Sequence, residues 1–238
     1  MRGPPLLEVR GLSAFYARAQ ALFGVSLDLK EGEVVALLGR NGAGKTTTLK
    51  AIMGLVTRSA EALTFAGQPI AHLPAFKIAR FGLGYVPEER RIFTDLSVDE
   101  NLEVGRKPAP TGRPAWTPER LFSIFPNLAE MRDRRASQMS GGEQQMLTIA
   151  RTLMGNPRAV FLDEPSEGLA PVIVELMAEA IGAMKRDGIA VLLSEQNLHF
   201  AAAVSDRAYV VERGQIRYEG TIDELSRNEA VRDAYLTV

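Results

Sequence analysis

The alternation of apolar and polar residues predicts strands in the N-terminal third of the chain. Residues 7–10 and 25–30 repeat with a period of two, which is typical of strands with one buried face. Residues 63–69 and 82–86 are two further expected strands, and Pro87 ends the second of them. We expect the first part of the chain to contain an antiparallel β-subdomain.

Three continuous apolar runs follow a different pattern. Residues 34–38, 160–162 and 189–193 are short and rich in branched side chains, as in strands buried on both faces of a parallel sheet. Segments with apolar residues at helical spacing lie between the second and third runs and after the third. This succession predicts an α/β fold whose ligand binds at the carboxyl ends of the strands.

Residues 88–155 differ again, because helix-start signals dominate there. Ser97 and Glu100 form a capping-box pattern, and Thr117 precedes a proline suited to a first helical turn. We interpret the chain as one domain, with residues 1–87 and 156–238 forming the core and residues 88–155 an inserted helical subdomain.

The first candidate site, which we call the phosphate loop, follows the apolar run 34–38. Its spacing matches the G-x-x-x-x-G-K-[ST] pattern, and a helical pattern follows it, so the context is strand, glycine-rich turn and helix. Backbone N–H groups of such a turn bind phosphate oxygens, the lysine reaches the β- and γ-phosphates, and the first threonine hydroxyl can ligate Mg²⁺. The loop consists of Gly39, Arg40, Asn41, Gly42, Ala43, Gly44, Lys45, Thr46 and Thr47.

A second candidate site lies where the run 160–162 ends in Asp163 and Glu164. Adjacent carboxylates at the end of a buried strand are costly unless a cation or a donor meets them. Asp163 is placed to hold Mg²⁺ through water, as the Walker B acid does, and Glu164 to accept a proton from the attacking water. A solvated strand end is the alternative for this segment alone.

A third candidate, the signature segment, consists of Ser140, Gly141, Gly142, Glu143 and Gln144. Ser140 and Glu143 form a capping box, so a purely structural helix start is one interpretation. Two glycines directly after the cap favour another, because glycine is a poor residue in a first helical turn. They suit the close approach of an anion to the helix N-terminus.

Composition narrows the class of protein. The chain has 238 residues, 46% of them hydrophobic, a formal net charge of −1 and no cysteine. Disulfides and thiol chemistry are excluded, and without a basic surplus we expect no nucleic-acid partner. We also expect no signal peptide and no membrane-spanning segment, because the apolar runs are short.

The order phosphate loop, helical insertion, Ser140–Gln144 and Asp163–Glu164 resembles the ATP-binding cassette (ABC) ATPases over essentially the whole chain. The resemblance implies a head-to-tail dimer in which ATP lies between the phosphate loop of one cassette and the signature segment of the other. It also places Tyr16 where an aromatic residue stacks on adenine. Within the family, four segments point to one branch: residues 86–93, 139–146, 167–171 and 195–197. They resemble the smaller ATP-binding subunit of bacterial importers for branched-chain amino acids, or for urea and amides.

That branch implies several partners and a location. They are a second, different cassette subunit (a homodimer is possible in isolation), two transmembrane permease subunits and, indirectly, a periplasmic binding protein. The implied location is peripheral, at the cytoplasmic face of the bacterial inner membrane. We expect the permease contact after Glu88, where Ile92, Phe93 and Leu96 offer an apolar patch; packing within the helical subdomain is the alternative.

Four positions depart from the commonest family pattern. Glu88 stands for a glutamine and can still ligate Mg²⁺, Gln196 stands for a histidine that contacts the γ-phosphate, Ala170 for an aspartate and Glu143 for a glutamine. Glu164 is retained, which favours a hydrolytic site. The alternatives are a non-hydrolysing regulatory cassette and a soluble cassette ATPase outside transport.

Overall fold

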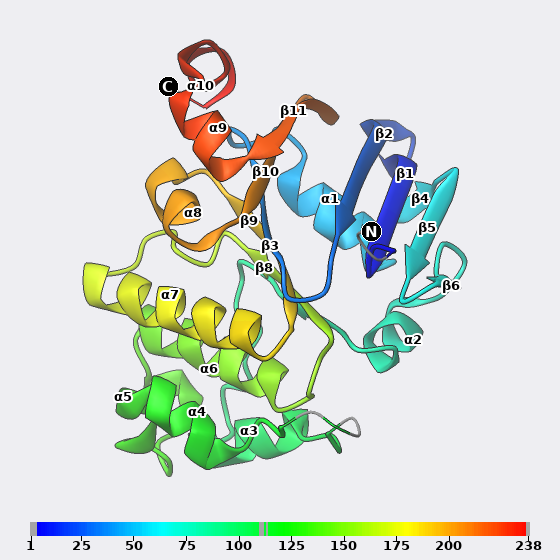
Figure 1. Cartoon of the computed structure of the whole chain (residues 1–238). Coiled ribbons are helices and arrows are strands. Elements are labelled where there is room, and N and C mark those ends of the chain that lie inside the picture. The colour runs from blue at the N-terminus through cyan, green and yellow to red at the C-terminus, as the bar shows by residue number, and fades with distance from the viewer. Residues whose placement is uncertain (1–3, 110–111, 113, 237–238) are drawn as a thin grey trace.

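The computed structural model describes residues 4–109, 112 and 114–236. Within these residues the strands form two sheets, with the antiparallel one beside the larger core sheet and helices packed on the remaining faces (Figure 1). The α/β fold class predicted from the sequence is confirmed.

The first sheet has the order β2-β1-β5-β6, with β4 also paired to β1. Its pairs are antiparallel, and apolar side chains alternate inward along β1 as the period of two predicts. Its strands are β1 (Leu7–Tyr16), β2 (Ala19–Leu29), β4 (Thr57–Ser59), β5 (Ala62–Phe65) and β6 (Gln68–Pro69).

The second sheet has the order β11-β10-β3-β9-β8-β7. The pairs from β10 to β7 are parallel, and β11 returns antiparallel to β10 as a hairpin. The middle strands are buried along their whole length, which explains their continuous apolar runs. Its strands are β3 (Val34–Leu38), β7 (Leu83–Val86), β8 (Ala159–Asp163), β9 (Ala190–Glu195), β10 (Arg207–Glu212) and β11 (Gln215–Thr221).

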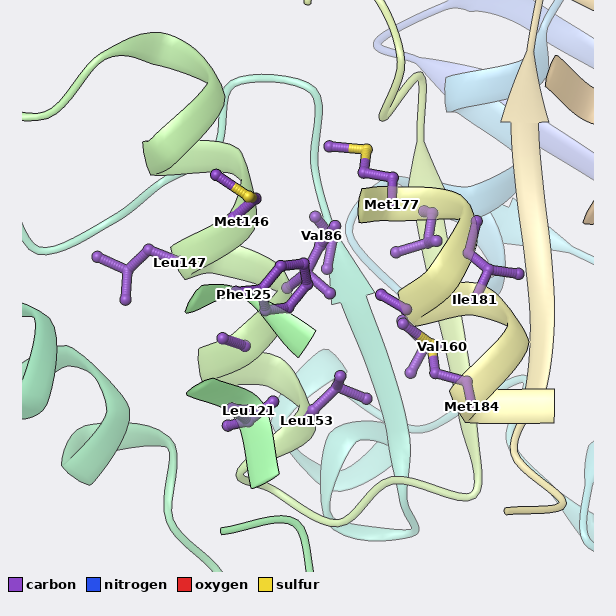
Figure 2. Packing of buried hydrophobic residues seen from close by; sticks show 14 of the residues in the cluster. Val86, Leu121, Phe125, Met146, Leu147, Leu153, Val160, Met177, Ile181 and Met184 are labelled. Carbon is purple, nitrogen blue, oxygen red and sulfur yellow. The ribbon is translucent and has the colours of Figure 1, made fainter. Parts of the chain in front are cut away.

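Two long helices carry the apolar contacts of one face of this sheet. Helices α6 (Gly141–Leu153) and α7 (Pro171–Arg186) each have an apolar face. Figure 2 shows how these faces meet around Val86 and Val160. Met146 of α6 and the nearby Phe125 lie on one side, and Met177 and Met184 of α7 lie on the other. This shared core holds α6 in a fixed place relative to the strand ends. The remaining helices are α1 (Lys45–Ile52), α2 (Ala75–Arg80), α3 (Val98–Gly105), α4 (Pro118–Ile124), α5 (Pro126–Ala129), the short 3₁₀ helix at Ala136–Gln138, α8 (Leu198–Val204), α9 (Ile222–Arg227) and α10 (Glu229–Tyr235).

Helix starts follow the capping signals in the sequence. The capping boxes predicted at Ser97 and Ser140 are both formed, and the Thr117 side chain accepts from the Arg120 amide at the start of α4. Side-chain oxygens thus bind amides that would otherwise lack a partner at a helix N-terminus.

Arg207 on β10 joins the two sheets. Its guanidinium bonds the carboxylates of Asp28 on β2 at 3.0 Å, Glu33 at 2.8 Å and Glu219 on β11 at 3.0 Å. The Tyr209 hydroxyl lies within 3.1 Å of the carboxylate oxygens of Asp28 and Glu219. The N-terminal sheet is therefore tied to strands from the last part of the chain.

In the part of the chain that the structure describes, no helix combines the length and apolarity that a membrane crossing requires.

Candidate active site

The phosphate loop connects the buried strand β3 to α1, as the sequence predicts. Gly42 and Gly44 have φ angles of 75° and 113°, values that favour glycine. Gly44 is also the N-cap of α1, and among the described side chains none caps this helix start. The first amides of α1 therefore remain available to an anion.

Lys45 folds back over the loop. Its Nζ donates to the carbonyl oxygens of Gly39 at 2.8 Å and Arg40 at 3.1 Å, and lies 3.0 Å from Glu164 Oε1. The side chain is only 3% exposed. The ammonium group is thus held at the centre of the loop, where a phosphate of a nucleotide would meet it.

Asp163 ends β8 and is fully buried. Its Oδ1 accepts from the hydroxyls of Thr46 at 2.9 Å and Ser194 at 2.7 Å, and its Oδ2 accepts from the Tyr85 hydroxyl at 2.9 Å. These bonds satisfy a carboxylate that would otherwise be costly to bury. Tyr85 and Ser194 were not predicted from the sequence, since both contacts depend on which strands flank β8.

Glu164 follows directly and has a φ angle of 46°, in the left-handed region. Its Oε2 accepts from Gln196 Nε2 at 2.9 Å, and the same Gln196 nitrogen lies 2.7 Å from Asn41 Oδ1. Burial opposes ionisation of Glu164, but donation from Gln196, Lys45 and Glu167 outweighs it and holds the pKa of this carboxyl below its ordinary value. Glu164 is therefore a carboxylate linked both to the phosphate loop and to the end of β9.

A cleft of about 430 Å³ opens over these groups. Glu88 is exposed on its wall, so the cleft brings together the phosphate loop, Glu164 and the carboxylate expected to ligate Mg²⁺. The sequence analysis did not include the other wall residues, which come from β2 and from the turn between β10 and β11: Ala21, Phe23, Arg213 and Gly214.

Tyr16, at the end of β1, is exposed, and its hydroxyl lies 3.4 Å from Thr47 Oγ1. This position is beside the phosphate loop and open to solvent, so the ring is accessible to a planar ligand.

Asp163, Thr46 and Glu88, the residues expected to hold Mg²⁺, carry only oxygen atoms as possible ligands. Among the described residues, no group of three or more histidine or acidic side chains is arranged to hold a metal ion. A site with a small number of protein oxygens beside a phosphate suits Mg²⁺, because this ion keeps several waters and takes ligands from substrate phosphates.

The signature segment lies at the N-terminus of α6, and its five residues are absent from the described wall of the cleft. Glu143 Oε2 accepts from the Ser140 amide at 2.6 Å, and the Gln144 side chain donates to the carbonyls of Ala136 and Met139, each at 3.2 Å. Glu143 and Gln144 thus hold the helix start, while Gly141 and Gly142 leave its backbone uncovered by side chains of their own.

A contact within the chain also accounts for Gly141. A Cβ atom on this residue would lie 2.5 Å from a guanidinium nitrogen of Arg90, so the glycine leaves room for that side chain. Arg90 belongs to the loop after β7, and its carbonyl accepts from Thr148 Oγ1 of α6 at 2.9 Å. The loop after Glu88 is therefore attached to the signature helix.

The three residues of the apolar patch expected in this loop have different surroundings. One packs inside the chain and another is exposed, so each of the two interpretations, internal packing and partner contact, fits part of the patch. Ile92 packs against the core of α6 and α7, whereas Phe93 is 48% exposed, with the Arg151 guanidinium 4.9 Å from its ring centre. Leu96 is half-buried. Of these three apolar side chains, Phe93 is therefore the exposed one.

A phosphate loop between a buried parallel strand and a helix, with an acidic pair at the end of another strand, defines a P-loop nucleotide-binding protein. A family model described as ABC transporter matches residues 22–167. The chain belongs to the ABC transporter family, and it is an ATPase that binds ATP.

Curated relatives extend over almost the whole chain. The high-affinity branched-chain amino acid transport ATP-binding protein BraG of Pseudomonas aeruginosa is 42% identical, over 97% of this chain and 99% of BraG. The lipopolysaccharide export system ATP-binding protein LptB of Escherichia coli is 35% identical, over 97% of this chain and 96% of LptB. The probable branched-chain amino acid transport ATP-binding protein LivF of Archaeoglobus fulgidus is 33% identical, over 94% and 95% of the two chains.

A solved ATP-binding subunit of an ABC transporter has a similar structure, with a TM-score of 0.82 and 28% identity over 97% of this chain and 96% of that one. An ATP-binding cassette solved in its ADP conformation gives a TM-score of 0.80 and 25% identity, over 97% and 98% of the two chains.

Proposed function

We propose that this protein is the ATP-hydrolysing motor subunit of an importer for branched-chain amino acids. The observation that carries the proposal is that Glu164, on the cleft wall, contacts both Lys45 and Gln196 beside the Thr46–Asp163 pair. The 42% identity with BraG along the whole chain supports the solute class. Urea and amides are the alternative solutes.

ATP binding would begin at the phosphate loop. The uncapped start of α1 and the Lys45 ammonium receive the β- and γ-phosphates, and the exposed ring of Tyr16 stacks on the adenine. Mg²⁺, held by Thr46, Asp163 and Glu88 with water, would neutralise negative charge on the phosphates when bound.

Glu164 then acts as the general base. A glutamate carboxyl is ionised near neutral pH, so Glu164 can take a proton from the water that attacks the γ-phosphate. Lys45 and Gln196 both contact this carboxylate. We infer that an arriving γ-phosphate competes for both donors, which releases Glu164 toward the attacking water only when ATP occupies the cleft.

Coupling to transport requires a second cassette. We propose that the signature segment contacts ATP bound to a partner cassette subunit, so that ATP closes the dimer and hydrolysis reopens it. Residues 88–155 would move as a helical subdomain, and Phe93 would contact one of two permease subunits at the cytoplasmic face of the bacterial inner membrane. A periplasmic binding protein would deliver the solute from the other side.

The first test compares the wild-type chain with Glu164→Gln in Mg·ATP. We expect hydrolysis to fall at least about 100-fold, as for loss of a general base, while ATP affinity is kept or raised because Lys45 loses its anionic partner. Tagged Glu164→Gln is then recovered from native membranes, and co-purifying chains are identified by mass spectrometry. A second cassette subunit and two amino-acid permeases are expected.

Lys45→Ala is the matched control, because it should bind little ATP and trap no closed dimer. Recovery of lipopolysaccharide-export permeases, of ribosomal or DNA-associated proteins, or of a homodimer alone would contradict the importer. Absence of Mg²⁺-dependent hydrolysis in the wild-type complex would instead support a regulatory cassette.

A further inference from the structure

Glu195, at the end of β9, is a buried carboxylate that the hydrolysis scheme above does not use. Its side chain is 2% exposed. Oε1 accepts from the Ser166 amide at 3.1 Å, and Oε2 accepts from the Asn197 amide at 3.3 Å. Each carboxylate oxygen thus binds the backbone of a different loop.

These two loops carry the groups proposed to act on the attacking water. Ser166 lies two residues after Glu164, and Asn197 directly follows Gln196. A third bond, from the Glu164 amide to the Ser194 carbonyl at 3.0 Å, connects the same segments. The backbone around Glu164 is therefore fixed to the backbone around Gln196 on both sides of their side-chain contact.

Such a buried carboxylate needs a physical reason, because desolvation disfavours its charged form. Burial raises the pKa of Glu195 despite the donations from Ser166 and Asn197, and the charge of Glu164 acts in the same direction. A neutral side chain would fill the position without this cost. An ionised carboxylate differs from an amide in one respect that matters here: both of its oxygens can face N–H donors.

The conformations of the two loops also bear on this role. Glu164 is in the left-handed region, a conformation that costs free energy for a residue with a side chain and persists only where its surroundings hold it. The Asn197 side chain accepts from the Phe200 amide and caps α8, so the Asn197 bond orients the start of that helix as well.

We propose that Glu195 is a positioning residue for ATP hydrolysis, whose carboxylate joins the Glu164 loop and the Gln196 loop into one unit. The inference rests on the roles proposed for Glu164 and Gln196. A γ-phosphate that moves Gln196 thereby also moves the segment from Ser166 toward α7.

The test is Glu195→Gln, which keeps the volume but places an NH₂ group against one of the two amides. We expect kcat to fall about 10- to 100-fold, the size of effect produced by small misplacement of reacting groups, with the KM for ATP changed less than about twofold. Hydrogen–deuterium exchange of the peptides around residues 165–170 and 196–200 should accelerate.

Glu33→Gln is the matched control. Glu33 is another poorly exposed carboxylate, and its loss weakens the Arg207 contacts between the sheets. We expect this variant to lower the melting temperature, leave kcat unchanged, and leave exchange around residues 165–170 as in the wild type.

A double-mutant cycle distinguishes a positioning role of Glu195 in hydrolysis from a role in stability alone. If Glu195 acts through Gln196, then Gln196→Ala combined with Glu195→Gln should lose less activity than the product of the single losses. Should Glu195→Gln fold poorly, Glu195→Asp serves instead, since it keeps the charge but shortens the reach, and it should also lower kcat.

Wild-type kcat in either Glu195 variant, or fully multiplicative losses in the cycle, would overturn the inference. The proposed function is tested separately by Glu164→Gln. If that variant hydrolysed ATP as fast as the wild type, Glu164 would not be the general base, whatever the Glu195 variants show.

Discussion

The starts of α1 and α6 are both rich in glycine, yet they are built in opposite ways. Gly44 begins α1 in the left-handed conformation, and in the described structure no side chain caps it. Ser140 begins α6 with a complete capping box, formed with Glu143. One helix start is left open and the other is closed by its own side chains.

This difference indicates whether each helix start can bind a ligand by itself or contacts a ligand that another site holds. The open start of α1 can surround a phosphate with its own amides and Lys45, so it can bind nucleotide within one chain. In α6 the box occupies the amides of Ser140 and Glu143, and the two glycines present a narrower stretch of backbone. The signature segment therefore suits contact with a ligand that is already bound elsewhere.

The strongest way to test the contrast is to damage α1. Lys45→Ala removes the ammonium from the centre of the phosphate loop and leaves the Glu164 carboxylate without its cation. We expect ATP affinity and hydrolysis each to fall about 100-fold or more, because charge-assisted bonds to phosphate are among the strongest in such sites. Titration with a fluorescent ATP analogue and a phosphate-release assay measure the two effects.

Lys50→Ala is the control on the same helix, since Lys50 faces Glu89 at 3.8 Å near the surface. Tight ATP binding by Lys45→Ala would contradict the assignment of α1 as the nucleotide-binding start.

An intermediate effect is expected at α6. Gly141→Ala adds a Cβ where the Arg90 guanidinium lies, and it covers part of the exposed helix start. We predict that kcat falls about 10- to 100-fold, the range for small misplacement at a reacting centre, while ATP binding to the isolated chain is unchanged.

The free energy of unfolding checks that prediction, because alanine in a helix favours stability over glycine by about 0.5–1 kcal/mol. A variant that is as stable as the wild type but hydrolyses slowly fits the contrast. Unchanged hydrolysis would mean that Gly141 only leaves room for Arg90.

The smallest expected effect is on the capping serines, and it distinguishes a cap that only stabilises a helix from one that also affects hydrolysis. Ser140→Ala and Ser97→Ala remove the same capping box from α6 and α3, and each should lower the free energy of unfolding by about 1 kcal/mol. Only Ser140→Ala should also slow hydrolysis, by a few-fold, as its helix start loosens. Chemical denaturation and phosphate release measure both, and equal hydrolysis by the two variants would contradict a functional role for the α6 cap.

Features that depend on residues close together in the sequence could be predicted from it. The phosphate loop, the buried run ending in Asp163 and the boxes at Ser97 and Ser140 all have local signals, and the structure has each of them. Helix capping and strand burial act over a few residues, so their patterns survive in the chain itself.

The contacts within the site could not be predicted, because they depend on the order of the strands. Tyr85 and Ser194 reach Asp163 because β7 and β9 flank β8, and β9 also separates β8 from β3. Glu195 was not among the candidate site residues, and its two amide partners lie in different loops. The Arg90 contact with Gly141 likewise joins residues from separate elements.

The place of β3 between β10 and β9 has a consequence for synthesis. Leu38 leaves the ribosome long before Ala190 and Glu212, so at about 5–20 residues per second the phosphate-loop strand waits roughly ten to thirty seconds for its two neighbours. Until then both edges of an apolar strand are unpaired, which is a template for aggregation. Nascent chains of this cassette should therefore depend on chaperones late into translation, and a chain truncated before β9 should fail to form a nucleotide site although it contains the whole phosphate loop.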